Sequence, residues 1–379
     1  MALTGWADGR PLAAPGAPAS MLRAALATLR SIAGCDTLPG VQLLGERAAA
    51  LALSRRAPRS PGGGFQPLRA ADGWVGLTLS RPWDFRALPA LLERESSGDP
   101  WTATARWAAQ RSTEEVVKRA RLLDLACAKI PERPAGRPSA PFDLFRCGPP
   151  HDMPDHPTVV DLTSLWAGPL CAHLLGLCGA RIIKVESTQR PDGARRAAGR
   201  FFDLLHGGHE SVALDLTLRT DIEHLRGLLC AADIVLEGSR PRALDHLGID
   251  ARKIAANGGT WVSITAYGRG HQAVGFGDDV AAGGGLVAYD GARPTPAVCG
   301  DALADPLSGA VAALGAFAAA RTGGACILDV AMIDVAAWAA GAAVEPGPSV
   351  PAEPPRSRPL TKTAPPLGRD TRRVLSELT

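Results

Sequence analysis

Short apolar stretches alternate with helical stretches over residues 158–344, and this alternation constrains the fold more than any other feature. The predicted strands are residues 158–162, 181–186, 212–216, 234–237, 261–265 and 326–330. Helices are expected at 169–177, at 220–230 and from Asp305 onward. Continuous apolar strands that alternate with helices predict a parallel sheet covered on both faces. Ligands of such sheets bind at the carboxyl ends of the strands.

Two proline-rich tracts divide the chain, and the part that precedes them has an α/β pattern of its own. Residues 73–79 alternate like a half-buried strand, and Ser112 opens a helix through a capping box with Glu115. The fold class we predict is α/β, with a Rossmann-like large domain and a smaller α/β domain N-terminal to it. The expected segments are a small domain with a loose N-terminal leader at 1–130, a linker at 131–157, the large domain at 158–344, a linker at 345–364 and a C-terminal helix at 365–379.

Charge and cysteine usage argue against several classes of protein. The formal net charge of +3 comes without a basic stripe, so no nucleic acid is expected as a partner. The longest uncharged apolar run, 306–320, is shorter than the roughly 20 residues of a membrane span, so no membrane is expected either. The eight cysteines form no CxxC pair, and the histidines are dispersed, so we expect no metal. Reduced cysteines and the absence of a recognisable signal peptide predict a cytoplasmic location.

A nicotinamide dehydrogenase is the default expectation for this fold, and the sequence disfavours it. No GxGxxG follows the first predicted strand. The stretch 268–273 is a GxGxxA, but Gly275, Gly277 and two aspartates follow it instead of a helix. Phosphate binding by this motif requires a helix N-terminus at that point. We therefore interpret 268–273 as a loop.

Asp305 stands directly before Pro306 and an alanine-rich run. Aspartate is preferred at the N-cap of a helix, and proline at its first position. We predict that Asp305 is an N-cap, where free N–H groups and the helix dipole would hold its carboxylate ionised. These residues alone are consistent with a plain cap as well as with a reactive carboxylate.

Several motifs of the large domain resemble the class III (CaiB/BaiF, formyl-CoA transferase-like) CoA-transferases. In the order of that family they are VDLT (160–163), WAGP (166–169), GARIIKVE (179–186), SVALDL (211–216), ADIVLE (232–237), ALAD (302–305) and LDVA (328–331). PPLG at 365–368 resembles the start of the family's C-terminal helix. Residues 65–130 resemble its small domain, which in the usual order follows the large one. The chain is thus similar to a rearranged member, acting as a homodimer or paired with another family chain.

The resemblance implies a chemistry and a set of contacts. Asp305 would attack an acyl-CoA as nucleophile, and CoA would pass to a carboxylic acid acceptor. Coenzyme A or acyl-CoA would be a substrate, with no cofactor bound permanently. The positions that match CoA contacts of the family are Leu165, Trp166, Ala167, Ser187, Leu214, Gly238, Ser239, His246 and Thr265. Several of these are basic or amide residues elsewhere in the family, and five nearby arginines are the expected substitutes: Arg190, Arg195, Arg196, Arg240 and Arg242.

Other assignments of the reactive groups remain open. Asp301 also precedes the helix, although the spacing to Gly309 favours Asp305. Asp278 and Asp279 are adjacent acids that could transfer protons, but a solvated loop pair is the simpler expectation. The glycines at 283–285 are a candidate for close backbone approach to an oxyanion, or a plain turn.

Two other functions remain open. An acyl-CoA racemase or epimerase of the same fold needs a histidine near residues 275–279, where the sequence has none, and His271 is expected in a surface loop. A non-catalytic CoA-binding partner subunit would explain the altered domain order.

Overall fold

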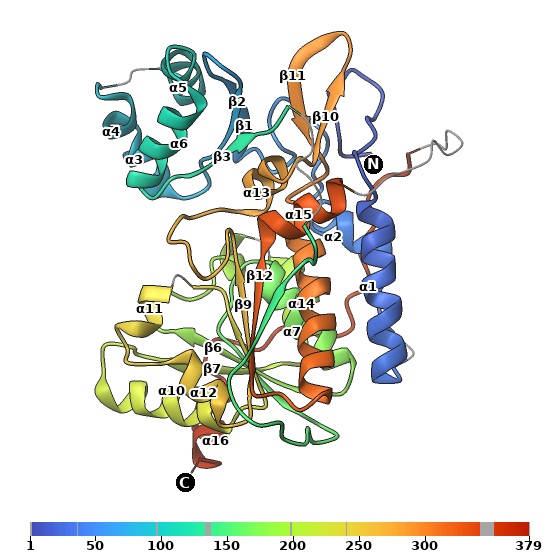
Figure 1. The fold of residues 1–379 in the computed structure, drawn as a ribbon, viewed down its shortest axis with the longest axis vertical. Coiled ribbons are helices and arrows are strands. Elements are labelled where there is room, and N and C mark those ends of the chain that lie inside the picture. Colours follow the sequence, from blue (N-terminus) through green and yellow to red (C-terminus); the bar gives the residue numbers. More distant parts are fainter. Residues whose placement is uncertain are drawn as a thin grey trace.

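The computed structural model describes residues 2–35, 37–95, 98–132, 138–197, 199–239, 241–341 and 352–378. Within them the large unit is built on a seven-stranded sheet of order β4-β12-β9-β8-β5-β6-β7 (Figure 1). Neighbouring strands are parallel, except that β4 runs antiparallel to β12. The bounds are β4 (Asp143–Arg146), β5 (Thr158–Asp161), β6 (Arg181–Ser187), β7 (Glu210–Leu214), β8 (Ile234–Glu237), β9 (Thr260–Thr265) and β12 (Cys326–Ala331). The predicted parallel, Rossmann-like α/β sheet is confirmed.

Helices cover both faces of this sheet because its strands are apolar on both sides. In β5, Val159 packs into the core beneath α7 and α14, whereas Val160 packs into the core beneath α10. The first face carries α1 (Pro18–Ala33), α7 (Ala167–Leu177), α9 (Gly199–His206), α14 (Ala304–Arg321) and α15 (Met332–Ala340). The second carries α10 (Arg219–Ala231), α11 (Pro241–Asp245), α12 (Ala251–Ala256) and α16 (Thr371–Ser376). A short helix, α8 (Ala194–Ala197), precedes α9.

Helix α14 is the central helix of the first face. It is alanine-rich and buried on nearly all sides, as expected of a helix enclosed by other elements rather than lying on a surface. It packs against α7 on one side and α1 on another. A Cβ atom on Gly309 would come within 2.6 Å of the carbonyl oxygen of Ala167, so glycine is what permits this close approach of α7.

The small unit is an antiparallel three-stranded sheet with helices packed on it. Its strands are β1 (Phe65–Arg69), β2 (Trp74–Thr78) and β3 (Ala126–Ile130), and its helices are α3 (Pro82–Arg86), α4 (Leu88–Leu92), α5 (Pro100–Ala108) and α6 (Thr113–Leu122). These elements enclose a separate hydrophobic cluster that includes Trp101 and Trp107. The capping box of Ser112 and Glu115 is present, with Glu115 N–H donating to Ser112 Oγ at 3.3 Å.

Helix α13 (Gly277–Gly283) joins the two units. It packs against β2 and β3 of the small unit and against α14 and α15 of the large one (Figure 1). A hairpin, β10 (Val287–Asp290) with β11 (Arg293–Val298), follows it and leads back to the turn before α14.

The N-terminal segment departs from the predicted organisation. Instead of forming a loose leader, Leu3 and Thr4 are buried, and Thr4 Oγ1 accepts a hydrogen bond from the N–H of Gly300 at 3.0 Å. Helix α1 packs on α14 of the large unit rather than on the small sheet. The 3-10 helix η1 (Val41–Gly45) and α2 (Glu46–Ala50) also lie beside the large unit. The helical periodicity of residues 21–33 predicts α1, but a local pattern does not tell which surface the helix covers.

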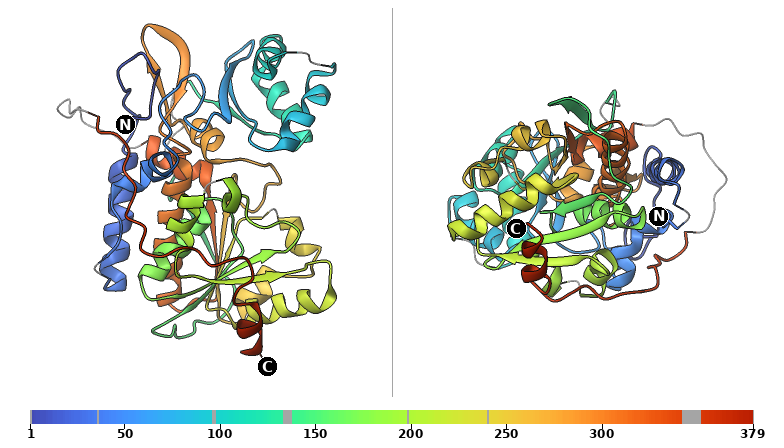
Figure 2. Two further views of the ribbon diagram at one scale, coloured as in Figure 1. Left: turned by 180° about the vertical axis from the view of Figure 1, so that it is seen from behind. Right: turned by 90° about the horizontal axis from the view of Figure 1, so that it is seen from below.

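Both expected linkers contain residues with defined places in the fold. The first contributes β4 to the edge of the large sheet. Part of the second lies outside the described residues, but residues 352–364 run along the large unit toward α16 (Figure 2). There Arg358 pairs with the buried carboxylate of Glu46 at 2.7 Å. Among the described residues, no helix combines the length and the apolar character that crossing a bilayer demands.

Candidate functional site

A cavity of about 400 Å³ opens at the carboxyl ends of the central strands. The chain order reverses at β5, since β6 and β7 follow on one side and β8, β9 and β12 on the other. Ligands of open α/β sheets bind at such a reversal. The wall is formed by Leu162, Thr163, Ser164, Leu165, Ala167, Gly168, Gly238, Ser239, Ile264, Thr265, Ala266, His271, Ala273, Val274, Gly275, Phe276, Asp305 and Met332, with Arg81 from the small unit.

Asp305 presents its carboxylate to this cavity from the first turn of α14. The helix begins at Ala304 with Leu303 as its N-cap, so the predicted N-cap position of Asp305 is wrong by two residues. The backbone N–H of Ala167, at the start of α7, hydrogen-bonds to the carboxylate. Oδ2 lies directly against Gly277, where a Cβ atom would approach it to 1.9 Å. The starts of α7, α13 and α14 therefore meet around this one side chain.

The electrostatic environment of Asp305 differs from the one predicted. The pKa of its carboxyl is raised to about 7, chiefly by burial, and the neighbouring carboxylates of Asp278 and Asp301 act in the same direction. The guanidinium of Arg47 and the N–H of Ala167 act in the opposite direction. Loss of water around the side chain thus outweighs the helix N-terminus that was expected to keep the carboxylate ionised.

Asp301 is fully buried and does not line the cavity, which leaves Asp305 as the accessible acid of the two. Arg47 donates from Nε and Nη2 to the carboxylate of Asp301 at 2.9 and 2.6 Å. The guanidinium carbon of Arg47 also lies 5.3 Å from the centroid of the Trp166 ring. Both carboxylate oxygens of Asp301 are therefore occupied by the ion pair with Arg47.

Asp278 and Asp279 are buried in the first turn of α13, not solvated in a loop as expected. Asp278 Oδ1 accepts from the N–H of Ala302 at 2.8 Å. Asp279 Oδ1 accepts from Phe276 N–H at 2.8 Å and from Thr78 Oγ1 at 2.9 Å. Burial raises the pKa of Asp278 to about 6 and that of Asp279 to about 7. These bonds connect α13 to the small unit and to the turn before α14.

A second cavity, of about 410 Å³, continues along the same edge of the sheet. It shares Leu162, Ser164 and Ser239 with the first cavity. The rest of its wall consists of Val185, Glu186, Ser187, Gln189, Arg190, Asp192, Leu216, Thr217, Leu225, Ala243, Leu244 and Leu247. Because they share Leu162, Ser164 and Ser239, the two cavities adjoin, and together they are called the cleft.

Comparison with known proteins identifies the family of this chain. The model of CoA-transferase family III matches residues 155–366, which is more than half of the chain. The chain belongs to CoA-transferase family III. The matched residues include all strands of the large sheet except β4, together with Asp305 and the whole cleft wall except Arg81.

Relatives with assigned names match about half of this family III chain. A succinyl-CoA–D-citramalate CoA-transferase of Chloroflexus aurantiacus is 30% identical over 204 residues, covering 49% of this chain and 50% of the relative. A probable fatty acyl-CoA transferase of Mycobacterium tuberculosis, Rv3272, is 32% identical over 229 residues, covering 54% and 53%. A crystal structure of Rv3272 covers 50% of this chain and 57% of its own, with 30% identity and a TM-score of 0.44. The chain thus spans about half the length of these relatives.

Most positions that match CoA contacts of the family line the cleft. Leu165, Ala167, Gly238, Ser239 and Thr265 line the first cavity, and Ser187 lines the second. The hydroxyl of Ser239 donates to the carboxylate of Glu237 at 3.1 Å, which fixes its direction.

Three of these positions lie elsewhere. Trp166 is buried beneath Arg47, with its ring edge-on to Phe201. Leu214 belongs to the core on the second face of the sheet. His246 is exposed but lines neither cavity, whereas its neighbours Leu244 and Leu247 line the second.

Of the arginines expected near the phosphates, Arg190 lines the second cavity. Arg195 is instead engaged by Glu186, with its Nη2 atom 2.5 Å from Oε2. Arg196 lines neither cavity. Arg240 lies outside the described residues, as does the side chain of Arg242.

Two charged residues near the site were not predicted from the sequence. Arg47 and Arg81 come from the N-terminal half, and no motif there marks either of them. His271 lies exposed in a loop, as expected, and it also lines the cavity together with Asp305. The glycines at 283–285 do not line the cavity; Gly283 and Gly284 provide close packing against Ala128 and Ala336.

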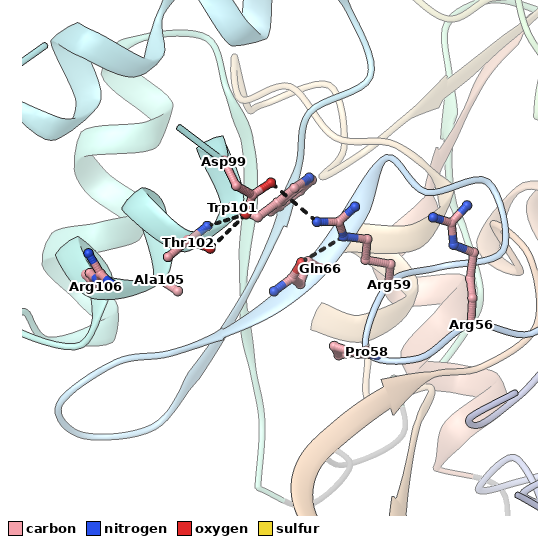
Figure 3. A pocket seen from close by; sticks show the side chains of 9 residues that line it. All are labelled: Arg56, Pro58, Arg59, Gln66, Asp99, Trp101, Thr102, Ala105 and Arg106. Atoms are coloured by element: carbon pink, nitrogen blue, oxygen red, sulfur yellow. Dashed lines mark hydrogen bonds and ion pairs between the residues drawn. The ribbon is translucent and has the colours of Figure 1, made fainter. Parts of the chain in front are cut away.

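A larger hollow, of about 680 Å³, lies beside the small unit and is distinct from this cleft (Figure 3). Arg56, Arg59 and Arg106 contribute its positive charge. The guanidinium of Arg59 covers the ring of Trp101 at 5.6 Å and lies 3.7 Å from the carboxylate of Asp99. The Trp101 ring and the Arg59 guanidinium are therefore already partnered within the protein, and Asp99 is the one acidic side chain among the described residues that line this hollow.

Proposed function

We propose that this chain transfers CoA between an acyl-CoA and a free carboxylic acid, with Asp305 as the nucleophile. The position of the Asp305 carboxylate carries the proposal. It stands in the segment that resembles the one carrying the family's nucleophile, within the residues that match the family, and it faces a cavity at the ligand-binding edge of a parallel sheet.

In the reaction we propose, a carboxylate oxygen of Asp305 attacks the thioester carbonyl, and the carbon–sulfur bond breaks to release CoA thiolate. The thiolate then attacks the aspartyl carbonyl of the resulting anhydride, which gives an aspartyl-CoA thioester and the donor acid. The carboxylate of the acceptor attacks this thioester, forming a second anhydride and releasing the thiolate again. Attack of the thiolate on the acceptor carbonyl gives the new acyl-CoA and restores Asp305. Covalent catalysis thereby divides one exchange into easier steps.

The pKa of Asp305, raised by burial to about 7, fits this role. Near neutral pH a substantial fraction of the side chain is ionised, and a carboxylate that has lost much of its water is a stronger nucleophile than a solvated one. The N–H of Ala167 holds the carboxylate in one orientation. Ionisation and orientation are the two properties that the first step requires.

The two adjoining cavities suggest how CoA would bind. We propose that its nucleotide occupies the second cavity, where Leu216, Leu244 and Leu247 offer apolar surface and Arg190 a positive charge. The pantetheine arm would then pass Ser164 and Ser239, which border both cavities, and bring the thioester to Asp305. No permanently bound cofactor is needed for this chemistry.

The acceptor acid would enter from the side of the small unit. Arg81 and His271 line that part of the cavity and can attract a carboxylate. Arg81 is oriented by Asp84, to which its Nε donates at 2.8 Å, and by the carbonyl of Asp124. The guanidinium also lies over the ring of Phe276, at 5.5 Å from its centroid.

We further propose that the chain works in the cytoplasm as a homodimer or together with another family chain. The assembly is proposed because the match covers only about half of each of these relatives. The molar mass of the purified protein by light scattering, alone and with a candidate partner, decides between these assemblies.

A racemase or epimerase is the second candidate, because His271 and Asp305 line the same cavity. An imidazole and a carboxyl on two sides of a bound acyl-CoA can remove and return an α-proton. Exchange of that proton with deuterated water, without transfer of CoA, would identify this chemistry.

The test of the transferase is intact-protein mass spectrometry after incubation with a panel of acyl-CoAs, with hydroxylamine to trap the activated carboxyl. We expect a covalent adduct on wild type and none on Asp305→Asn, which preserves the shape of the side chain. Asp143→Asn is the matched control, because Asp143 lies exposed on the edge strand β4. An adduct that persists in Asp305→Asn, or no adduct despite measurable CoA binding, contradicts the proposal.

A further inference from the structure

Arg47 connects the N-terminal segment to the surroundings of Asp305. It lies on α2, outside the residues that match the family. Its guanidinium makes two contacts there: the bidentate ion pair with Asp301, at 2.9 and 2.6 Å, and the face of the Trp166 ring, at 5.3 Å. Planar arginine suits both contacts, because it pairs with two carboxylate oxygens and stacks on aromatic rings.

Each of these two contacts adjoins a segment that holds Asp305. Asp301 begins the turn that leads into α14, and in that turn the N–H of Asp305 donates to the carbonyl of Ala302 at 2.9 Å. Ala302 has a positive φ of 45°, an unusual conformation for alanine that must be held by its surroundings. Trp166 is the N-cap residue of α7 and directly precedes Ala167, whose N–H binds the Asp305 carboxylate.

Arg47 also supplies positive charge to an otherwise acidic centre. The charged groups around Asp305 are Arg47 from α2, Asp278 from α13 and Asp301 from the preceding turn, with Arg81 and His271 on the cavity wall. Two of the three nearest groups are carboxylates that oppose ionisation of Asp305, and Arg47 is the one that favours it. Removing a buried cation from such a cluster leaves the carboxylates uncompensated.

We propose that Arg47 is a positioning residue for the transfer reaction: it fixes the turn before α14 against the start of α7 and keeps the Asp305 carboxylate ionised at neutral pH. This inference rests on the function proposed above. The N-terminal segment lies outside the family match, and through Arg47 it would position and ionise the Asp305 carboxylate.

The experiment is the pH dependence of single-turnover adduct formation, measured from pH 5 to pH 9 on the full chain. Wild type should show a rate that rises through a midpoint near pH 7, in line with the pKa of about 7 for Asp305. In Arg47→Gln the midpoint should move up by about one pH unit, so that the rate falls about tenfold at pH 6 and recovers at pH 9. Arg47→Lys should lie between the two, because it retains the charge but not the bidentate geometry.

In Asp301→Asn the pH midpoint of adduct formation should shift in the opposite direction. It removes a carboxylate that raises the pKa of Asp305 and leaves Arg47 in place, so the midpoint should move down. Arg293→Gln is the matched control, since Arg293 likewise pairs with an aspartate, Asp8 at 3.0 Å, and covers a tryptophan ring, that of Trp6 at 4.8 Å. Its midpoint should equal that of wild type.

The outcomes separate the two proposals. If wild type forms an adduct and neither Arg47→Gln nor Asp301→Asn moves the midpoint, Arg47 has only a structural role and the inference is overturned. Uniform loss of rate at every pH leads to the same conclusion. If Arg47→Gln does not fold, Arg47→Lys still decides, because a midpoint equal to that of wild type in this variant overturns the inference. No adduct on wild type with any acyl-CoA overturns the proposed function and this inference with it.

Discussion

Gly277→Ala should abolish the proposed CoA transfer without unfolding the protein. A Cβ atom at this position would lie 1.9 Å from Oδ2 of Asp305, whereas Cβ atoms in real structures essentially never approach another heavy atom within 3.0 Å. The difference, 3.0 minus 1.9, requires the carboxylate oxygen to move by at least about 1.1 Å. Misplacing a reacting group by about 1 Å can lower the rate about 100-fold. The same Cβ atom would meet Ala302, at 2.7 Å from Cβ and 2.8 Å from the carbonyl oxygen, which hinders relaxation of the turn.

The effect on stability should be modest by comparison. Overpacking costs about 1–3 kcal/mol, and replacing glycine by alanine in a helix returns up to about 1 kcal/mol. The assay is single-turnover adduct formation at pH 8, together with urea unfolding of the same samples. We expect a loss of about 100-fold in rate and a fall of at most about 2 kcal/mol in the unfolding free energy.

Two glycine variants separate carboxylate displacement from general damage. Gly270→Ala, in the loop before α13, places its Cβ atom in open space and should resemble wild type. Gly284→Ala, at the other end of α13, would clash with Ala336 Cβ at 2.6 Å but does not contact Asp305, so it should lose stability and largely retain its rate. A wild-type rate in Gly277→Ala, or an equal loss of rate in Gly284→Ala, would refute the reasoning.

Two further predictions concern stability. Burial raises the pKa of Asp279 from 3.8 in the unfolded chain to about 7, so the folded state binds this proton more tightly and the unfolding free energy should decrease as pH rises from about 4 to 7. Asp279→Asn should reduce that slope by up to about 1.4 kcal/mol per pH unit. Urea titrations measure the slope, and the exposed Asp72→Asn is the control. Lys184 is buried 3.5 Å from both Asp161 and Asp192, so Lys184→Met should cost about 3–5 kcal/mol of unfolding free energy by leaving buried carboxylates unpaired. The exposed Lys129→Met should cost less than about 0.5 kcal/mol, and a similarly small loss in Lys184→Met would contradict the account.

The organisation of the site illustrates how far local patterns reach. The sequence marks Asp305 because Pro306 follows it at the start of a helix, whereas the reason for Gly309, which lets α7 approach, appears only in the tertiary structure. The ionisation state of Asp305 could not be predicted from the sequence, because its pKa depends on burial and on charges contributed by α2 and α13. The N-cap expectation was wrong in the same way, since the turn before α14 is fixed by Asp278 and Arg47 and not by residues next to Asp305.

The sequence by itself determined the parallel α/β sheet, the order of its strands along the chain and the position of Asp305 next to the start of a helix. These follow from short-range effects: apolar periodicity, turn residues and helix caps act within a few positions of one another. Only the tertiary structure decided that α1 and α2 belong with the large unit, that Asp278 and Asp279 are buried, and that Arg47 and Arg81 lie beside the cleft. These depend on which surfaces pack together, and contacts between residues hundreds of positions apart leave no local trace in a single sequence.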